Sequence, residues 1–357
     1  MKILFLVPYP TEGASNRFRV EQYLPYLEEK GILYKVRPFI SSDFYRILYL
    51  KDYLLKKILF FLRSTVFRIL DVLRALKYDI IFIHRESYPL GPPFIERILK
   101  FFNKKVIFDF DDAIFLPASS GSNIFMERFN RYGKVPEVIA LSDGVITGNK
   151  YLADFALKYN ENVTIIPTPV DVELYAPSPK KIHSEKVTIG WIGSKTTSVF
   201  LKPMRDIFAV LLEKFPYLEI IIVGGRFDNR GLERVRNIDW SLENEIGALQ
   251  NFDIGIMPMP DTKWTRGKCA FKAILYMSVG IPCVSSPVGV TADLIKDGVN
   301  GFLAGSADAW KKKLSMLIES PDLRERIGRN ARETAVNEYS VKANVPKFLE
   351  VLNRVKG

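Results

Sequence analysis

The sequence predicts an α/β protein with two Rossmann-like domains, because buried strands alternate with helical segments in two successive series. The first run, residues 2–7 (KILFLV), is apolar throughout and ends at a proline, as expected of a parallel strand buried on both faces. Further runs of this kind follow at 78–84, 105–110, 143–149 and 163–167. A second series of apolar runs follows at 187–193, 218–225, 252–258, 281–286 and 301–305.

Helical patterns and a polar linker divide the chain. Helices are predicted at 20–31, 197–214 and 340–355, and the Pro-containing stretch 171–186 is typical of a hinge. We therefore predict an N-terminal domain, a hinge, a C-terminal domain and a terminal helix packing back toward the N-terminal domain, with bounds at 1–170, 171–186, 187–338 and 339–357.

Composition limits the classes of function. The 357 residues are 48% hydrophobic and 25% charged, which is typical of a globular protein. Only two cysteines and two histidines occur, which favours a reducing, cytoplasmic compartment and argues against a His-rich metal site. We expect neither a signal peptide nor a spanning helix. The net charge of +11 favours anionic partners, but the chain has no nucleic-acid recognition motif, so we expect phosphorylated substrates or anionic lipid instead.

The most specific motifs lie between Phe252 and Gly301: FDIGIMPMPD, GKCAFKAILYMSVGIPCVSSPVG and DGVNGFL. This stretch resembles the donor segment of retaining glycosyltransferase family 4 (glycosyltransferase group 1), which has the GT-B fold. The matching residues are Asp253, Pro258, Met277, Gly280, Pro282, Gly289, Asp297, Gly298, Asn300 and Gly301.

The resemblance covers nearly the whole chain and implies two Rossmann-like domains facing an interdomain cleft. It implies a nucleotide-diphosphate-sugar donor bound mainly by the C-terminal domain. The acceptor, a glycan or a lipid-linked molecule, would bind mainly to the N-terminal domain. Transfer would retain the anomeric configuration, and basic side chains at the leaving group would make a cofactor or an essential metal unnecessary.

Candidate donor-binding residues follow several strands, where backbone donors and positive charge favour phosphate. Gly13 follows the first strand, and Arg226 follows the run at 218–225. The loop after 187–193 carries Gly193, Ser194 and Lys195. The alternatives are tight turns for the glycines and a surface salt bridge for the arginine.

The donor segment itself departs from the family pattern. Its E-x7-E acids fall on Gly267 and Leu275. Leucine cannot accept a hydrogen bond from ribose, so Glu243 or Glu245 would hold that ring, or it is held weakly. The remaining residues could bind the diphosphate; they are Lys268, Cys269, Ala270, Phe271 and Lys272. The lost acids also leave open a catalytically inactive, glycosyltransferase-like binding or scaffold protein.

Acidic residues follow the strand at 105–110, where Asp111 and Asp112 replace the family's His-Asp pair. We predict that they are catalytic, either taking the acceptor proton or binding sugar hydroxyls. Helix capping or a salt bridge is the structural alternative.

Four further charged residues are predicted to line the acceptor side. They follow two strands of the N-terminal domain and are Arg17, Arg19, Arg85 and Glu86. Structural ion pairing among Arg19, Arg85, Glu86 and Asp112 is an equally valid interpretation of the same pattern.

Residues 44–63 (FYRILYLKDYLLKKILFFLR) combine an apolar helical face with basic and aromatic residues, and 66–77 continues in this style. A basic amphipathic helix suits an anionic membrane surface, at the inner face of the cell membrane. The alternative is a helix that packs on the N-terminal sheet while its lysines face solvent.

Overall fold

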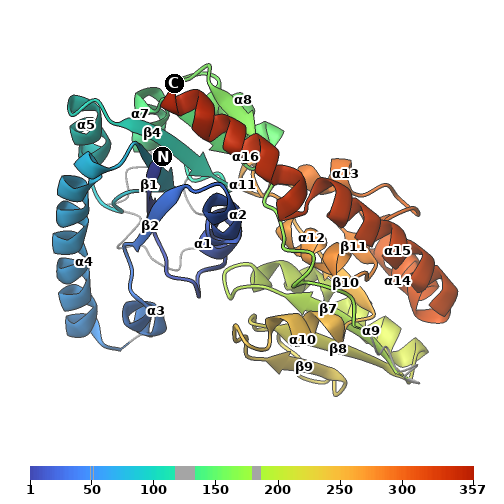
Figure 1. Ribbon diagram of the computed structural model, residues 1–357. Helices are drawn as coiled ribbons and strands as arrows, with labels where there is room; N and C mark the ends of the chain where they lie inside the picture. The colour runs from blue at the N-terminus through green and yellow to red at the C-terminus, as the bar shows by residue number, and fades with distance from the viewer. Residues whose placement is uncertain (49, 51, 117–132, 179–185) are drawn as a thin grey trace. The chain divides into compact units, whose positions relative to one another are not determined.

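The computed structural model describes residues 1–48, 50, 52–116, 133–178 and 186–357. They form two compact units (Figure 1). Unit 1 comprises Met1–Pro169 and Asn344–Gly357, and unit 2 comprises Val170–Ala343. The predicted α/β class is confirmed, because each unit contains one six-stranded sheet whose strand pairs are all parallel.

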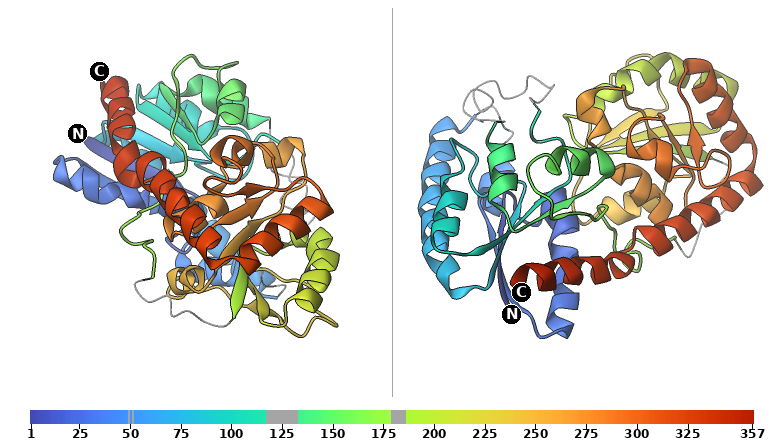
Figure 2. Two further views of the ribbon diagram at one scale, coloured as in Figure 1. Left: turned by 90° about the vertical axis from the view of Figure 1, so that its right-hand side faces the viewer. Right: turned by 90° about the horizontal axis from the view of Figure 1, so that it is seen from above.

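The sheet of unit 1 has the order β2-β1-β3-β4-β5-β6. In that order the strands are Leu33–Pro38, Lys2–Val7, Ile80–His84, Lys105–Phe110, Gly144–Thr147 and Val163–Ile165. Its helices are α1 Ala14–Arg19, α2 Leu24–Glu29, α3 Ser42–Leu48, α4 Leu54–Arg74, α5 Phe94–Phe101, α7 Lys134–Leu141 and α8 Lys150–Ala156. Helices α4 and α5 cover one face of this sheet (Figures 1 and 2).

The end of α16 (Val341–Lys356) belongs to unit 1 and packs on the opposite face of its sheet, beside α1 and α2. Phe348 stacks on Tyr23 with ring centroids 4.2 Å apart and contacts Phe82 at 5.7 Å. Gly144 makes room for Val355, since a Cβ at position 144 would stand 2.8 Å from its Cγ2 atom. The last turns of the chain therefore complete the core of unit 1.

The sheet of unit 2 has the order β12-β11-β10-β7-β8-β9. In that order the strands are Phe302–Leu303, Cys283–Ser285, Ile254–Met257, Val187–Ile192, Leu218–Val223 and Val235–Ile238. Its helical elements are η3 Ser198–Met204, α9 Arg205–Lys214, α10 Glu245–Gln250, α11 Lys263–Arg266, α12 Phe271–Ser278, α13 Val290–Leu294, α14 Ala307–Glu319 and α15 Pro321–Glu338.

Two glycines on neighbouring strands of unit 2 let aromatic rings lie directly on the sheet. A Cβ at Gly190 of β7 would stand 2.0 Å from the Phe252 ring, and one at Gly255 of β10 would stand 2.4 Å from the Tyr276 ring. The Tyr276 hydroxyl also accepts a hydrogen bond from the backbone N–H of Ile192 (3.1 Å). These contacts hold α12 against the carboxyl end of β7.

The described part of the predicted hinge is fastened to unit 2. Arg332 on α15 donates hydrogen bonds to the carbonyl oxygens of Val172 (2.6 Å) and Tyr175 (3.0 Å), and Gln250 donates to that of Ala176 (2.8 Å). The remainder of the predicted hinge, 179–185, lies outside the described residues.

Two strands were missed by the sequence prediction, β2 and β9, and both are edge strands. Most of their side chains are exposed or only partly buried, and both strands lack the continuous apolar run that marks the central strands. The predicted helix at 197–214 is also divided, because Pro203 lies within the 3₁₀ segment η3 and α9 begins only at Arg205.

The amphipathic stretch 44–63 is not one helix, and its apolar face does not pack on the sheet. Phe44 belongs to α3, is buried and stacks on Phe60 (centroids 5.6 Å apart). In α4 the residues Leu55, Leu59 and Leu62 are exposed. Helix α4 does pack on the sheet with Lys56 exposed, as the alternative expected, but most of its leucines stay exposed. No helix of the described ranges is both long and apolar enough to cross a membrane.

Replacement of Gly190 by alanine tests the close packing of the sheet in unit 2. The new methyl group overlaps the Phe252 ring, so we expect Gly190→Ala to lower the free energy of unfolding by about 1–3 kcal/mol. Gly247→Ala is the matched control, because position 247 lies in α10 and has open space around it. Alanine there should be neutral or stabilising by up to about 1 kcal/mol. Equal effects of both variants in urea denaturation would contradict this packing.

Candidate functional site

The candidate residues lie at the carboxyl ends of the strands around the point where strand order reverses in each sheet. This point falls between β1 and β3 in unit 1 and between β7 and β10 in unit 2. The two loops that leave such a pair of strands run to opposite faces of the sheet. Open α/β sheets bind ligands at this position.

In unit 2 the structure brings together Gly193, which leaves β7, and Lys272, in the first turn of α12. A Cβ at position 193 would stand 2.5 Å from Cε of Lys272 and 2.7 Å from the Trp191 ring. The Lys272 ammonium lies 5.3 Å from the centroid of that ring. Only glycine at position 193 therefore lets the lysine approach the end of β7 along this path.

Two glycines after β8 complete this cluster, and the sequence prediction did not single them out. A Cβ at Gly224 would stand 2.4 Å from the carbonyl oxygen of Gly193, and one at Gly225 would stand 2.5 Å from the Trp191 ring. Gly224 also has a positive φ of 75°. The signal was present as a Gly-Gly pair directly after a buried strand.

Ser194 and Lys195 lie in an exposed turn after Gly193. The carbonyl oxygen of Ser194 accepts hydrogen bonds from the N–H groups of Thr197 and Ser198, both at 3.1 Å. The element that follows is the 3₁₀ segment η3, so this turn does not carry the dipole of a regular α-helix that the prediction assumed. What it offers an anion is the exposed Lys195.

The segment from Lys268 to Phe271 leads into α12. Cys269 and Ala270 are buried, and Ala270 adopts a left-handed conformation (φ 53°) as the N-cap residue of α12. The Lys268 ammonium lies 3.6 Å from the centroid of the Trp264 ring. Lys268 and Lys272 are both half-buried, and each lies over an indole ring.

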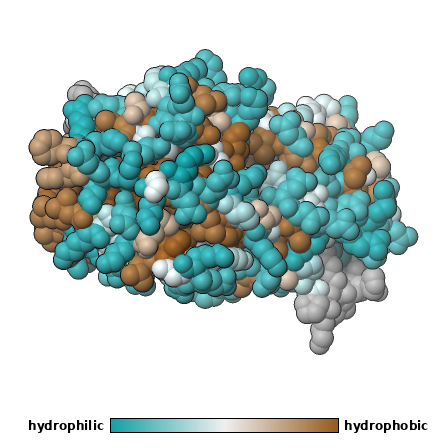
Figure 3. Space-filling view, turned by 45° about the horizontal axis from the view of Figure 1, so that its top comes forward, coloured by the Kyte–Doolittle hydropathy of each residue, from teal (hydrophilic) through white to brown (hydrophobic). Residues whose placement is uncertain are grey.

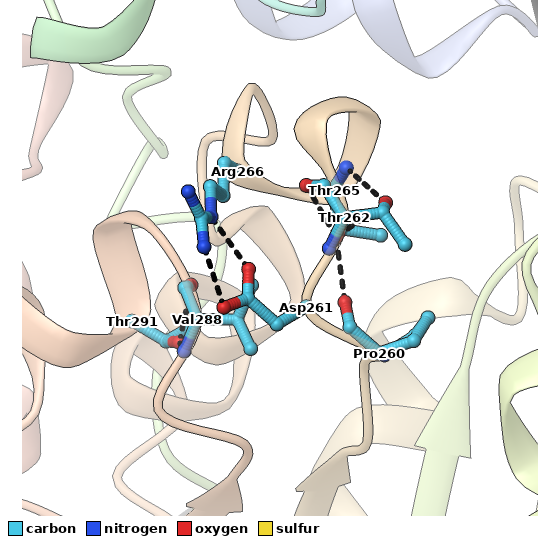
Figure 4. Close-up of polar contacts among 7 residues, drawn as sticks. All are labelled: Pro260, Asp261, Thr262, Thr265, Arg266, Val288 and Thr291. Atoms are coloured by element: carbon cyan, nitrogen blue, oxygen red, sulfur yellow. Dashed lines mark hydrogen bonds and ion pairs between the residues drawn. The ribbon is translucent and has the colours of Figure 1, made fainter.

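Polar contacts hold two loops in place, the loop before this segment and the loop after β11 (Figure 4). The Arg266 guanidinium donates to both carboxylate oxygens of Asp261 (2.6 and 2.8 Å), and Thr262 and Thr265 form a capping box at the start of α11. The loop after β11 is closed by Thr291, whose hydroxyl donates to the Ser286 carbonyl oxygen (2.6 Å). A Cβ at Gly289 would stand 2.8 Å from the Arg266 carbonyl oxygen, so the two loops touch through their backbones.

The positions of the missing acids, Gly267 and Leu275, are both buried, and Leu275 lies in α12. Of the two proposed substitutes, Glu245 is buried and accepts hydrogen bonds from the hydroxyl of Tyr175 and from Nε1 of Trp240 (2.7 Å). Glu245 therefore has a structural role, whereas Glu243 is exposed. Arg226 is also exposed and pairs with Asp239 (2.8 Å).

In unit 1 a buried ion-pair cluster joins the ends of β3 and β4. Nε of Arg19 donates to Asp109 (3.2 Å), and Nη1 donates to the carbonyl oxygen of Ile166 (2.7 Å). Nδ1 of His84 lies 2.6 Å from Oδ2 of Asp109, the same oxygen that accepts from Nε of Arg19. All three side chains are almost fully buried. Arg19, predicted to contact the acceptor, instead anchors three parts of the unit to one another.

Next to this cluster, Arg85 and Asp111 form a second ion pair. A guanidinium nitrogen of Arg85 lies 2.7 Å from Oδ1 of Asp111, with the side chains 24% and 11% exposed. Arg85 has a left-handed φ of 61°, which is unfavourable for a residue with a side chain, and its N–H donates to the Asp109 carbonyl oxygen (2.7 Å). Residues held in such conformations cluster at functional sites.

The remaining candidates of unit 1 have mainly local contacts. Asp112 accepts a hydrogen bond from the Ala113 N–H (3.0 Å), Arg17 donates to the Thr11 carbonyl oxygen (3.2 Å), and Glu86 lies 3.6 Å from the Lys134 ammonium. Gly13 packs against Tyr9, because a Cβ at position 13 would stand 2.4 Å from Cβ of that tyrosine.

The charge state of Asp111 follows from its neighbours. Burial raises the pKa of its carboxyl group, but the charge and hydrogen bond of Arg85, together with the nearby His84 and Arg19, outweigh this effect and lower the pKa to about 2. Asp111 is therefore ionised at neutral pH. A carboxylate with so low a pKa is a poor general base, yet it accepts hydrogen bonds from hydroxyl groups well.

Among the described residues, no three His, Cys, Asp or Glu side chains are close enough to hold a metal ion. The prediction that no metal is essential stays a prediction.

Comparison with known proteins shows similarity in sequence and in fold. Residues 187–320, which form most of unit 2, match the family model described as Glycosyl transferases group 1. The whole fold is similar to the crystal structure of HepE from Anabaena in complex with UDP-glucose, with a TM-score of 0.70 at 17% sequence identity over 99% of each chain. The fold and the domain match together support a GT-B glycosyltransferase.

Two curated relatives are similar in sequence. An uncharacterized glycosyltransferase of Methanocaldococcus jannaschii is 23% identical over 290 residues, which is 73% of this chain and 71% of the relative. The capsular polysaccharide biosynthesis glycosyltransferase CapM of Staphylococcus aureus is 21% identical over 178 residues, covering 45% of this chain and 44% of the relative.

Replacement of Asp111 by asparagine tests the charge assignment in unit 1. Because the pKa of about 2 in the folded state lies below the ordinary value of 3.8, the unfolded state binds more protons between these pH values. The carboxylate thus stabilises the fold by about 2 kcal/mol above pH 4, and this contribution disappears as the pH falls toward 2. Urea denaturation should show Asp111→Asn less stable at pH 7, with a difference that shrinks below pH 4. A difference independent of pH would contradict the assignment.

Proposed function

We propose that this protein is a retaining glycosyltransferase that transfers a sugar from a nucleotide-diphosphate-sugar donor to a glycan or lipid-linked acceptor. The proposal rests on the contact between Gly193 and Lys272, at the point where strand order reverses in the sheet of unit 2. A bare glycine backbone beside a lysine is an arrangement suited to a diphosphate, because the chain can approach closely and supply both charge and N–H donors.

The two lysines of the donor segment are assigned to the leaving group. As the bond between the sugar and the diphosphate breaks, negative charge grows on the phosphate oxygens. Lys272 and Lys268 are preorganised by their indole neighbours and would stabilise that charge without prior rearrangement. Lys195 and Arg226 supply further positive charge from the adjacent loops.

Asp111 and Asp112 are assigned to the sugar hydroxyls rather than to proton removal. The low pKa of Asp111 supports this division of roles. The departing phosphate then takes the acceptor proton on the face of the sugar from which it leaves. Attack and departure on the same face produce retention. The protein contributes position and charge.

The donor and acceptor classes rest on the relatives. HepE was crystallised with UDP-glucose, and CapM acts in capsular polysaccharide biosynthesis. We therefore propose a uridine-diphosphate sugar as the first donor to test and a cell-surface glycan pathway as its setting. The chain has only two cysteines, both buried, which agrees with a reducing compartment, so we propose a cytoplasmic enzyme.

Titration with nucleotides tests the donor assignment. We expect Lys272→Ala to weaken binding of UDP about 10- to 100-fold in calorimetry, because a charged hydrogen bond contributes about 1.5–3 kcal/mol. Lys312→Ala is the matched control, since Lys312 is an exposed lysine of α14 in the same unit. If the two variants bind UDP equally well, the lysine is not a diphosphate ligand. If the wild type binds no UDP, GDP or ADP, the protein is a scaffold rather than an enzyme.

The stereochemistry of the product tests the reaction. With a nucleotide sugar whose anomeric carbon is α-linked, NMR of the first product formed should show an α-linkage. The reaction should continue after treatment with EDTA if lysines replace a metal. A β-linked first product would show inversion and would refute the retaining mechanism.

A further inference from the structure

Helix α4 of unit 1 buries mainly polar side chains and exposes apolar ones, which is the reverse of an ordinary surface helix. Its buried residues are Ser64, Arg68, Asp71 and Val72, so only one of them is apolar. The Arg68 guanidinium donates to the carbonyl oxygens of Val7 (3.1 Å) and Arg37 (3.2 Å). Asp71 pairs with Arg37 at 2.7 Å. Polar contacts therefore attach this helix to the ends of β1 and β2.

The outward side of α4 is apolar along its whole length. The exposed fraction reaches 70% for Leu55, 58% for Val66 and 62% for Leu73. The end of α5 and the residue after it extend the surface with Phe101 (81% exposed) and Phe102. We call this surface the α4–α5 apolar face; its residues are Leu54, Leu55, Ile58, Leu59, Leu62, Val66, Ile69, Leu70, Leu73, Leu76, Ile98, Phe101 and Phe102.

Figure 3 shows hydrophobic side chains gathered at the margin where α4 and α5 lie in Figure 1. Single exposed leucines are ordinary on protein surfaces, but a contiguous patch over two helices is not. A helix that exposes its leucines and buries an arginine and an aspartate is shaped for a medium more apolar than water on its outer side.

The charges beside this face indicate which medium that is. No Asp or Glu occurs between Tyr53 and Leu70, whereas Lys56, Lys57 and Arg63 do. The ammonium of Lys56 and the guanidinium of Arg63 lie over the rings of Tyr53 (5.3 Å) and Phe67 (5.4 Å), at the border of the apolar stripe. Apolar side chains bordered by cations match the layered chemistry of an anionic bilayer surface.

A second copy of the chain fits this face less well. A symmetric dimer would bring the same surface of both copies together, and with it two sets of cationic side chains. The helix offers no acidic residue between Tyr53 and Leu70 to neutralise them. Lipid headgroups supply that negative charge.

We propose that the α4–α5 apolar face docks this protein on an anionic lipid bilayer, with α4 lying parallel to the membrane plane. The 21 residues of α4 form a rod about 32 Å long, which is enough to present the entire stripe to the surface at once. This proposal stands apart from the proposed sugar transfer. It also places the docking surface on α4 and α5 rather than on the whole of 44–63, where Phe44 is buried.

Sedimentation with vesicles tests the proposal on the full-length protein. The wild type should partition at least tenfold more strongly into phosphatidylcholine vesicles containing phosphatidylglycerol than into pure phosphatidylcholine vesicles. The double variant Leu62→Gln/Val66→Gln should lose most binding to both. The double variant Lys56→Gln/Arg63→Gln should lose mainly the preference for the anionic vesicles.

The control is Val210→Gln/Met316→Gln, which replaces two exposed apolar residues of unit 2 and should bind like the wild type. All six substituted positions are exposed on helices, so circular dichroism should show folded proteins. Wild type that remains in the supernatant with both vesicle types overturns the proposal. So does a dimer in lipid-free sedimentation velocity that Leu62→Gln/Val66→Gln dissociates, because a second copy would then cover the face.

Discussion

The position of Tyr276 is the constraint on which the candidate donor site depends. Its ring lies on the bare backbone of Gly255, and its hydroxyl bonds the last residue of β7. Together these contacts fix both the height and the rotation of α12 over the sheet. Lys272 lies one turn earlier on the same side of that helix, so it reaches Gly193. A shift of α12 by one residue would turn the lysine away from the end of β7. Packing in the core thus positions a charge at the surface.

The candidate residues of unit 1 are held instead by two neighbouring ion pairs. The pair of Arg19 with Asp109 is fully buried and links β4 to α1 and to the segment after β6. The pair of Arg85 with Asp111 is partly exposed and can therefore contact a ligand. The buried pair also fixes the position of the exposed one, because the N–H of Arg85 donates to the carbonyl oxygen of Asp109.

Much of this architecture could be predicted from the sequence, and the exceptions have physical reasons. The central strands are continuous apolar runs, whereas the edge strands β2 and β9 are half-exposed and were missed. The candidate donor residues Gly193 and Lys272 lie at a strand end and a helix start as predicted, but their contact could not be predicted because it depends on the ring of Tyr276. Charge alone did not distinguish Arg19 from Arg85, because both follow buried strands and only burial separates their roles. The direction of the apolar face of α4 was likewise hidden, since periodicity shows that a face exists but not which way it points.

We propose that the bare backbone at Gly193 and the side chain of Lys272 form a diphosphate site. The most direct test is a crystal structure of this protein with a nucleoside diphosphate bound. We expect phosphate oxygens within hydrogen-bonding distance of Nζ of Lys272 and beside the backbone of Gly193. A nucleotide whose phosphates lie away from the ends of β7 and α12 would contradict it.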